Sequence, residues 1–339
     1  MANDDSYRQI RDYVCGLPAV ADWPEMKVLF ERAADKGDRN WQLPAVACIA
    51  VGGQPQQALA AMAAVACLQV SIIFVDDLLD ADPRGEYHRI GAGGAANLAL
   101  AFQAAGCEAI FSGNATLEAR LSAIEALNEM AARTALGQQL DVLNTADEPG
   151  YWRVVEAKSG SYFGAALYIG ALFGGARDDT ARQIVNLGRL YGEIVQLYDD
   201  LKDCLSVPAN PDWRQRRSPL PILYARNVVH PGRARFAALV ERLAACSDEN
   251  GALAEAQAIL VRSSAVSYCI YQILDRYRRG RAILQSLPLL HPLGLEALLE
   301  EQLGPVRHLL GQVGWVDDEL IKHLGPSQAE MPGSWVEPA

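Results

Sequence analysis

Three carboxylates, Asp76, Asp77 and Asp80, follow one another within five positions at the end of a long apolar stretch. Residues 58–75, which lead into them, contain no charged side chain. If the stretch is helical, Asp76 and Asp80 lie one turn apart on the same face. Like charges at this spacing destabilise a helix unless a cation lies between them. The spacing therefore indicates a cation-binding site.

A second carboxylate cluster occurs much later in the chain. Asp199, Asp200 and Asp203 repeat the spacing and again follow an apolar stretch. Mg²⁺ takes oxygen ligands and keeps some of its water, so carboxylates on two facing helices fit a Mg²⁺-diphosphate site. There the metal would bind the substrate, neutralise its charge and stabilise a departing diphosphate. Apolar walls would suit a long hydrocarbon and would keep water from a reactive cation. The two clusters together predict one shared metal site.

The composition is that of a folded protein with a large core. The chain has 339 residues, of which 50% are hydrophobic and 21% charged, and its formal net charge is −11. This charge argues against a nucleic-acid-binding protein, whose binding face is normally basic. The N-terminal residues are acidic and lack the basic and apolar regions of a signal peptide, so the cytoplasm is the expected location.

The apolar stretch over residues 58–75 is long enough to be tested as a membrane span. It contains Gln69 and Ser71, is rich in alanine, and runs directly into three aspartates. We therefore expect a buried core helix and no transmembrane segment.

The elements that must position the two clusters are predicted to be helices throughout. The sequence shows no convincing alternating strand pattern and no Asn-Gly hairpin signal. Helical spacing and breakers predict helices over residues 5–36 (broken at Pro18 and Pro24), 46–51, 56–80, 95–110, 117–142, 151–176, 180–203, 218–226, 230–245, 252–285 and 292–310. Residues 208–217 are predicted to form a loop. We expect one all-α domain of about a dozen helices over residues 1–325 and a flexible tail over residues 326–339.

The two clusters resemble the aspartate-rich motifs of the trans-isoprenyl diphosphate synthases, the class I polyprenyl synthases. Residues 76–80, Asp-Asp-Leu-Leu-Asp, match the family's first motif. Residues 196–203, Gln-Leu-Tyr-Asp-Asp-Leu-Lys-Asp, match the second motif together with its preceding glutamine. Lys202 lies inside the second motif, and the resemblance implies that it reaches phosphate.

Three further segments resemble the same family in the same order. Residues 137–141 are similar to its Gly-Gln-x-x-Asp segment. Lys158 falls where the family has a Lys-Thr pair, whose lysine contacts diphosphate. Residues 217–221 resemble the Lys-x-Thr-x-Pro segment that follows the second motif. The matches cover about residues 40–225 of the chain.

The resemblance implies a class I isoprenoid synthase fold, with the two motifs facing each other across a central cavity. Mg²⁺ would hold the diphosphate of an allylic isoprenyl diphosphate there and promote its ionisation. The double bond of isopentenyl diphosphate would then attack the cation, and proton loss would give a chain five carbons longer. Family members are commonly homodimers.

The resemblance also assigns roles to individual residues. The implied metal ligands are Asp76, Asp77, Asp80, Asp199, Asp200 and Asp203. The implied catalytic residues are Asp76, Asp77, Asp80, Lys158, Asp199 and Asp200. The residues expected to contact substrate are Arg39, Ser71, Ile72, Arg84, Gln138, Asp141, Gln196, Lys202 and Arg217.

The chain departs from the family where isopentenyl diphosphate is normally bound. Family synthases carry Gly-Gly-Lys-x-x-Arg-Pro there, whereas residues 37–44 read Gly-Asp-Arg-Asn-Trp-Gln-Leu-Pro and lack the lysine and arginine positions. The Arg-Arg-Gly after the first motif is reduced to a single arginine, Arg84. Each lost charge-assisted contact is worth roughly 1.5–3 kcal/mol, so the acceptor pocket is expected to differ from the family's.

Three hypotheses for the acceptor follow. In the first, the chain elongates its substrate with isopentenyl diphosphate, whose phosphates are bound by Arg39, Arg84 and Arg89. In the second, the prenyl group passes to an aromatic or peptide side chain or to a glycolipid, because Trp41 would suit an uncharged acceptor. In the third, the chain is a class I terpene cyclase, although the retained Asp-Asp-x-x-Asp of residues 199–203 counts against it. A non-catalytic subunit would be expected to lose an aspartate from one cluster, and none is lost.

Chain length is set in the family by side-chain size just before the first motif. Ser71 and Ile72 stand five and four positions before Asp76, and neither is aromatic. This cue favours a product or substrate of fifteen carbons or more.

Overall fold

A computed structural model of the chain describes residues 2–215, 217–245 and 250–312. Within these ranges the chain forms α-helices, two 3₁₀ helices and one π-helical turn, with no strand. The all-α prediction is confirmed. The chain divides into two units, Met1–Leu299 and Glu300–Ala339, and the site below lies in the first. The predicted tail, residues 326–339, lies outside the described residues, and its boundary stays a prediction.

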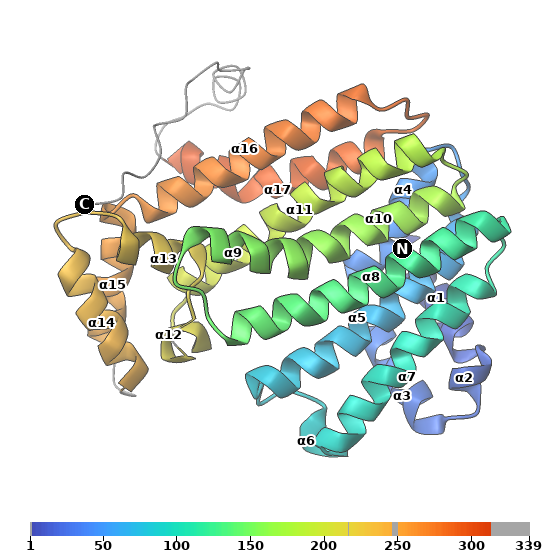
Figure 1. The fold of residues 1–339 in the computed structure, drawn as a ribbon, viewed down its shortest axis with the longest axis horizontal. Helices are drawn as coiled ribbons and strands as arrows, with labels where there is room; N and C mark the ends of the chain where they lie inside the picture. Colours follow the sequence, from blue (N-terminus) through green and yellow to red (C-terminus); the bar gives the residue numbers. More distant parts are fainter. Residues whose placement is uncertain (1, 216, 246–249, 313–339) are drawn as a thin grey trace. The chain divides into compact units, whose positions relative to one another are not determined.

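Figure 1 shows the helices along the chain. Their bounds are α1 (Ala2–Cys15), α2 (Pro18–Ala21), α3 (Pro24–Lys36), η1 (Arg39–Gln42), α4 (Leu43–Ala50), η2 (Pro55–Ala58), α5 (Leu59–Asp80), α6 (Tyr87–Ile90), α7 (Ala92–Phe111), α8 (Leu117–Val142), α9 (Glu148–Val155), η3 (Glu156–Gly160), α10 (Ser161–Phe173), α11 (Asp178–Leu205), α12 (Pro211–Gln215), α13 (Leu220–Asn227), α14 (Arg233–Ala245), α15 (Asn250–Arg262), α16 (Ala265–Ser286) and α17 (Leu293–Gln312).

The predicted helix boundaries are close where a breaker marks them and wrong in two places. The helix expected over residues 252–285 is two helices, because the chain adopts a left-handed conformation at Ser264 (φ 69°) between α15 and α16. The loop expected over residues 208–217 contains the short helix α12. Each feature depends on the conformation of only a few residues. Hydrophobic periodicity is read over a longer window and does not detect such short changes.

The helix that carries the first motif, α5, lies in the core. It is apolar nearly all round and packs against α1, α7 and α8. The segment Pro55–Asp80 is the one described helix long and apolar enough to cross a membrane, and 72% of its apolar window is buried inside the protein. The helix ends at Ala81, whose left-handed conformation (φ 52°) closes its last turn. The aspartates therefore stand at the open end of a buried helix.

Two glycines allow the remaining site helices to approach η3 closely. A Cβ atom on Gly137 of α8 would lie 2.7 Å from the backbone nitrogen of Lys158. A Cβ atom on Gly192 of α11 would lie 2.5 Å from the carbonyl oxygen of Ser159. Both distances are too short for any side chain. The glycines thus bring α8 and α11 against the π-helical turn that carries Lys158, a kind of turn that is frequent at functional sites.

Candidate active site

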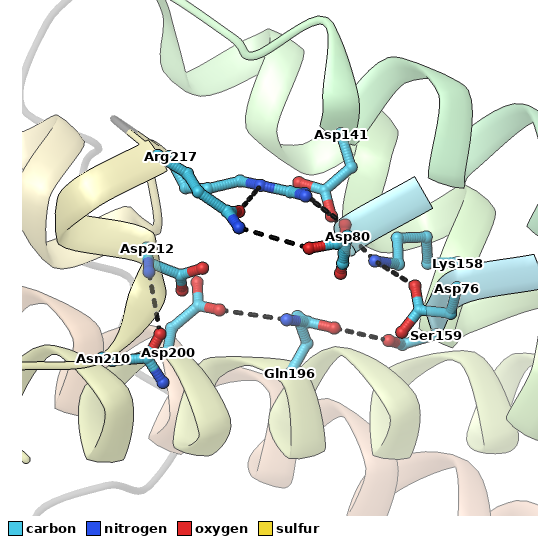
Figure 2. A network of polar contacts seen from close by, with 11 residues as sticks. Asp76, Asp80, Asp141, Lys158, Ser159, Gln196, Asp200, Asn210, Asp212 and Arg217 are labelled. Carbon is cyan, nitrogen blue, oxygen red and sulfur yellow. Dashed lines mark hydrogen bonds and ion pairs between the residues drawn. The ribbon is translucent and has the colours of Figure 1, made fainter. Parts of the chain in front are cut away.

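A cavity of about 160 Å³ lies where the two aspartate motifs meet. Its walls come from the ends of α5, α8 and α11, from α9 and η3, and from the segment that contains α12 (Figure 2). The predicted site residues that line it are Asp80, Asp141, Lys158, Gln196, Asp200, Asp203 and Arg217. The fold therefore brings residues from both motifs, and from the segments between and after them, to one place.

Two cations are held on the upper wall of this cavity by carboxylates. Lys158 Nζ donates to Asp141 Oδ2 at 2.7 Å, and Arg217 Nη1 lies 2.9 Å from the same oxygen. Arg217 also donates to Asp80, the last aspartate of the first motif (Figure 2). The arrangement points two hydrogen-bonding cations at the space between the motifs.

Asp76 has unused capacity to bind a cation. Its Oδ1 lies 3.9 Å from Lys158 Nζ and has no hydrogen-bond partner among the described residues. Burial raises the pKa of Asp76 to about 6, and the charges of Asp80 and Asp141 add to the rise while Lys158 opposes it. Burial also raises the pKa of Asp77. The negative charge of the first motif is thus not fully compensated by Lys158 and Arg217. A bound cation would reduce the repulsion among its carboxylates.

Asp200 of the second motif is almost fully engaged by the protein. Its Oδ2 accepts from the Tyr151 hydroxyl at 2.7 Å and from the backbone N–H of Leu220 at 3.2 Å. Its Oδ1 accepts from Gln196 Nε2 at 3.0 Å, and Gln196 Oε1 accepts from the Ser159 hydroxyl at 2.8 Å. The side chain is 7% exposed, and burial raises its pKa to about 6. Asp200 therefore ties α9, η3, α11 and the start of α13 together.

The other carboxylates of the second motif lie in different surroundings. Asp203 lines the cavity, whereas Asp199 is exposed and is not among the lining residues. Desolvation raises the pKa of both carboxyl groups, and Lys202 opposes the rise in each. Lys202 thus sits within reach of the charge of both, but it does not line the cavity.

Asp212 is a cavity residue that sequence reasoning missed. It lies in α12 and lines the cavity, and burial together with the charge of Asp203 raises its pKa to about 6. Its backbone N–H donates to Asn210 Oδ1 at 2.9 Å (Figure 2). No spacing relates it to either motif, so only its position in the folded chain identifies it.

The carboxylates of this site fit Mg²⁺ bound together with a substrate. Within the described part of the chain, no three His, Cys, Asp or Glu side chains form a ready-made metal site. Mg²⁺ is commonly held by one or two carboxylates plus substrate phosphates, so such a cage is not required. The unpartnered Oδ1 of Asp76 and the raised pKa values of the neighbouring carboxyl groups are what such an ion would satisfy.

The arginines expected to bind phosphate near the first motif lie elsewhere. Arg84 is 87% exposed and is held by Asp82, at 2.7 Å between Nη2 and Oδ2. Arg89 donates to Glu86 at 2.8 Å. Arg39 lines a separate cavity, formed by α1, the end of α3 and the start of η1, and not this one. The first acceptor hypothesis therefore keeps Arg39 as its candidate, in a different pocket.

Three further expected substrate contacts are not cavity-lining residues. The hydroxyl of Ser71 is buried and donates to the carbonyl of Ala99 on α7 at 2.8 Å. Ile72 is half-buried. Gln138 is 3% exposed, and neither amide atom has a hydrogen-bond partner among the described residues. None of the three therefore contacts the cavity, and the amide of Gln138 keeps unmet hydrogen-bonding capacity.

Tyr151 is a second residue that sequence reasoning missed, and it leads to a stability prediction. Tyr151→Phe removes the buried donor to Asp200 Oδ2 and is expected to lower the free energy of unfolding by about 1–2 kcal/mol. Chemical denaturation measures this change. Tyr271→Phe, at a 53% exposed tyrosine, is the control and should leave stability unchanged. Equal stability of both variants would contradict the role given to Tyr151.

The sequence was compared with protein families and with characterised proteins. The family model for polyprenyl synthetase matches residues 27–260. A nonaprenyl diphosphate synthase of Mycobacterium tuberculosis is 27% identical over 271 residues, covering 74% of this chain and 78% of the relative. A (2E,6E)-farnesyl diphosphate synthase of the same species is 30% identical over 234 residues, covering 62% of this chain and 63% of the relative.

Solved structures resemble the fold over nearly its whole length. Geranylgeranyl pyrophosphate synthetase from Pyrococcus horikoshii superposes with a TM-score of 0.76 at 18% identity, covering 89% of this chain and 97% of that chain. Decaprenyl diphosphate synthase from Rhodobacter capsulatus gives 0.74 at 20% identity, covering 90% and 97%. The fold is therefore the all-α class I isoprenoid synthase fold.

Proposed function

We propose, because this chain belongs to the polyprenyl synthetase family, that it is a Mg²⁺-dependent prenyltransferase that elongates an allylic isoprenyl diphosphate. In this proposal isopentenyl diphosphate is the second substrate, and a longer polyprenyl diphosphate is the product. The observation that carries the proposal is the cavity in which carboxylates of both motifs face Lys158 and Arg217. The relatives named as prenyl diphosphate synthases support the same class of reaction.

The proposed Mg²⁺ ligands are the carboxylates of the two motifs: Asp76, Asp77 and Asp80 of the first, and Asp199, Asp200 and Asp203 of the second. Asp80, Asp200 and Asp203 line the cavity. When bound, Mg²⁺ supplies positive charge that neutralises the diphosphate and stabilises it as a leaving group. The raised pKa values of Asp76 and Asp200 indicate that burial disfavours their ionised forms. A bound cation would stabilise these ionised carboxylates.

Lys158 and Arg217 are proposed to donate hydrogen bonds to the departing diphosphate. Both now share Asp141 Oδ2, and an arriving diphosphate would offer them further acceptor oxygens at the same wall. Asp141 would keep the two cations in place throughout. The buried apolar side chains of α5 would exclude water from the cation left on the allylic carbon.

A second candidate function is prenyl transfer to an uncharged acceptor. Its candidate aromatic residue, Trp41, is 2% exposed and stacks on Phe30 at a centroid distance of 5.4 Å, so Trp41 is a core residue. The observation behind this candidate is therefore the absence of the family's lysine and arginine positions from residues 37–44. This candidate predicts that isopentenyl diphosphate is not consumed.

One assay separates these functions. The protein is incubated with Mg²⁺ and dimethylallyl, geranyl, farnesyl or geranylgeranyl diphosphate, each with and without isopentenyl diphosphate. A longer diphosphate formed only with isopentenyl diphosphate is the expected result, and chelation of the metal should abolish it. A hydrocarbon or alcohol formed without isopentenyl diphosphate would identify a cyclase instead. Intact substrates in every arm would contradict elongation.

The homodimer and the cytoplasmic location stay predictions. Sedimentation of the purified chain would measure the first, and localisation of the tagged chain would measure the second.

A further inference from the structure

Three polar side chains occupy one face of α16. Tyr268, Gln272 and Arg276 follow one another at intervals of four residues, so they lie on the same side of the helix at successive turns. We call them the polar stripe. Arg276 is only 7% exposed, and an arginine is rarely so buried unless the protein pairs it. The polar stripe does not line the active-site cavity, and the proposed function leaves it without a role.

Arg276 connects three helices. Its Nε donates to Glu193 Oε2 on α11 at 2.5 Å, and its Nη1 donates to Gln272 Oε1 on α16 at 2.6 Å. Its guanidinium carbon lies 3.7 Å from the ring centroid of Trp152 on α9. A planar guanidinium can bind a carboxylate along its edge and an aromatic ring with its face at the same time. Arg276 therefore fixes α9 and α11 against α16.

Tyr268 makes a second connection from the same face of α16. Its hydroxyl donates to Glu148 Oε1 on α9 at 2.5 Å, and Trp152 Nε1 donates to the same oxygen at 2.9 Å. The ring of Tyr268 also stacks on Tyr224 of α13, at a centroid distance of 4.6 Å. The polar stripe thus holds both Glu148 and Trp152, which are one turn apart on α9, and it contacts α13 as well.

The helices that the polar stripe contacts are those that surround Asp200. Tyr151 of α9 meets its neighbour Trp152 edge-on, at a centroid distance of 4.9 Å, and donates to Asp200 Oδ2. The other donor to Oδ2 is the backbone N–H of Leu220, the first residue of α13. Asp200 itself lies on α11, seven residues after Glu193 and so on the same face. The direction of the Asp200 carboxylate therefore depends on how α9, α11 and α13 are held together.

We propose that Arg276 and Tyr268 are positioning residues for Asp200, and that they act through α9. This inference rests on the proposed function, in which Asp200 is a metal ligand. Side chains that orient a metal ligand from outside the site typically affect metal affinity or activity by tenfold to a hundredfold. Three protein donors already engage Asp200, so a shift of α9 would redirect the acceptor position that remains for a metal ion.

Arg276→Lys tests the role of Arg276. Lysine keeps a positive charge opposite Glu193, so no buried carboxylate is left unpaired, but it has no planar face for Trp152 and no fork of donors. Calorimetry of inorganic pyrophosphate binding, taken as the difference between Mg²⁺ and EDTA, should show binding weakened by about tenfold. In the elongation assay, kcat should fall by about tenfold while the KM for isopentenyl diphosphate stays unchanged.

Ile110→Val is the control for a loss of stability alone. Ile110 is fully buried on α7, three residues before Gly113, which meets Ala60 near the start of α5 and so at the end opposite the first motif. Removing one buried methylene destabilises a core without touching the polar stripe. Its kcat and its pyrophosphate binding should equal those of the unsubstituted chain, and thermal unfolding reports the stability of both variants. An equal loss in Ile110→Val, or no loss in folded Arg276→Lys, would overturn the proposal.

A double-mutant cycle tests whether the effect passes through α9. Tyr151→Phe removes the hydroxyl that α9 offers to Asp200. If Arg276 acts through that hydroxyl, Arg276→Lys should cost about tenfold in kcat in the unsubstituted chain and less than about threefold in Tyr151→Phe. A full tenfold cost in both backgrounds would contradict the proposed route.

Tyr268→Phe is a milder variant that tests the same proposal even where Arg276→Lys does not fold. It removes the hydroxyl that donates to Glu148 and keeps the ring that stacks on Tyr224. Pyrophosphate binding in Mg²⁺ should weaken by about threefold, and the effect should again shrink in the Tyr151→Phe background. Unchanged binding in folded Tyr268→Phe would remove Tyr268 from the positioning residues.

Failure of this inference can be told apart from failure of the proposed function. Elongation with unchanged kcat and unchanged pyrophosphate binding in folded Arg276→Lys would leave the proposed function intact and remove only the positioning role. Absence of elongation in the unsubstituted chain, with every allylic substrate, would remove the proposed function itself.

Discussion

Asp76→Asn is expected to lower the rate of prenyl transfer by about a thousandfold or more while leaving the fold as stable as before. Asp76 Oδ1 has no hydrogen-bond partner among the described residues, so the substitution deprives no protein donor of an acceptor at that oxygen. Burial and the charges of Asp80 and Asp141 disfavour the ionised carboxylate, as its raised pKa of about 6 indicates. Removing the charge therefore removes repulsion. Activity should therefore fall without a loss of stability.

Product formation at saturating Mg²⁺ and the thermal midpoint of the metal-free protein measure these two effects. Asp82→Asn is the matched control, because Asp82 lies two residues beyond the motif and is paired with Arg84. It should retain near-normal activity. An active Asp76→Asn variant would remove Asp76 from the proposed metal ligands, and an unfolded one would show that the side chain is structural.

Asp200→Ala is expected to abolish activity and also to destabilise the protein by about 2–5 kcal/mol. The substitution leaves the Tyr151 hydroxyl and the Leu220 N–H, both buried, without their acceptor. It also frees Gln196, which donates to the other oxygen of Asp200. These bonds hold the start of α13 against α9 and α11, and Arg217 precedes that helix by only a few residues. Loss of the bonds should therefore displace Arg217 from Asp80 and Asp141.

Urea unfolding and the activity assay measure this pair of effects. Asp200→Asn serves as the matched variant, because its carbonyl oxygen can still accept from Tyr151 and Leu220 while its negative charge is gone. It should recover most of the lost stability and little of the activity. If Asp200→Ala proves as stable as the unsubstituted chain, the hydrogen bonds to Asp200 do not support the site as described.

These two substitutions separate roles that the sequence treats alike. Asp76 and Asp200 belong to two motifs of the same spacing, Asp76 as the first aspartate of its motif and Asp200 as the second of its own. In the folded chain, Asp76 keeps an open oxygen, whereas three protein donors reach Asp200. An ionised carboxylate has about four acceptor positions, so Asp200 keeps roughly one for a metal ion, whereas Asp76 keeps more.

The sequence by itself determined the helical fold and predicted several residues that line one cavity, among them Asp80, Lys158 and Asp200. The part of α5 before Asp76 has no charged side chain and was predicted as a buried helix, and helical periodicity placed Asp76 and Asp80 on one face. The bounds of α8, Leu117–Val142, were predictable for the same reason. These properties are local, since they depend on residues within one or two turns of each other.

Only the tertiary structure decided which of those side chains are free to act and what surrounds them. Asp212 and Tyr151 carry no spacing signal, because the site residues around them come from distant parts of the chain. Arg84, which stands next to the first motif in sequence, is turned to solvent by Asp82. These contacts depend on how helices that are distant in the sequence pack together. Helical periodicity describes only residues within a few turns of each other, so it does not predict them.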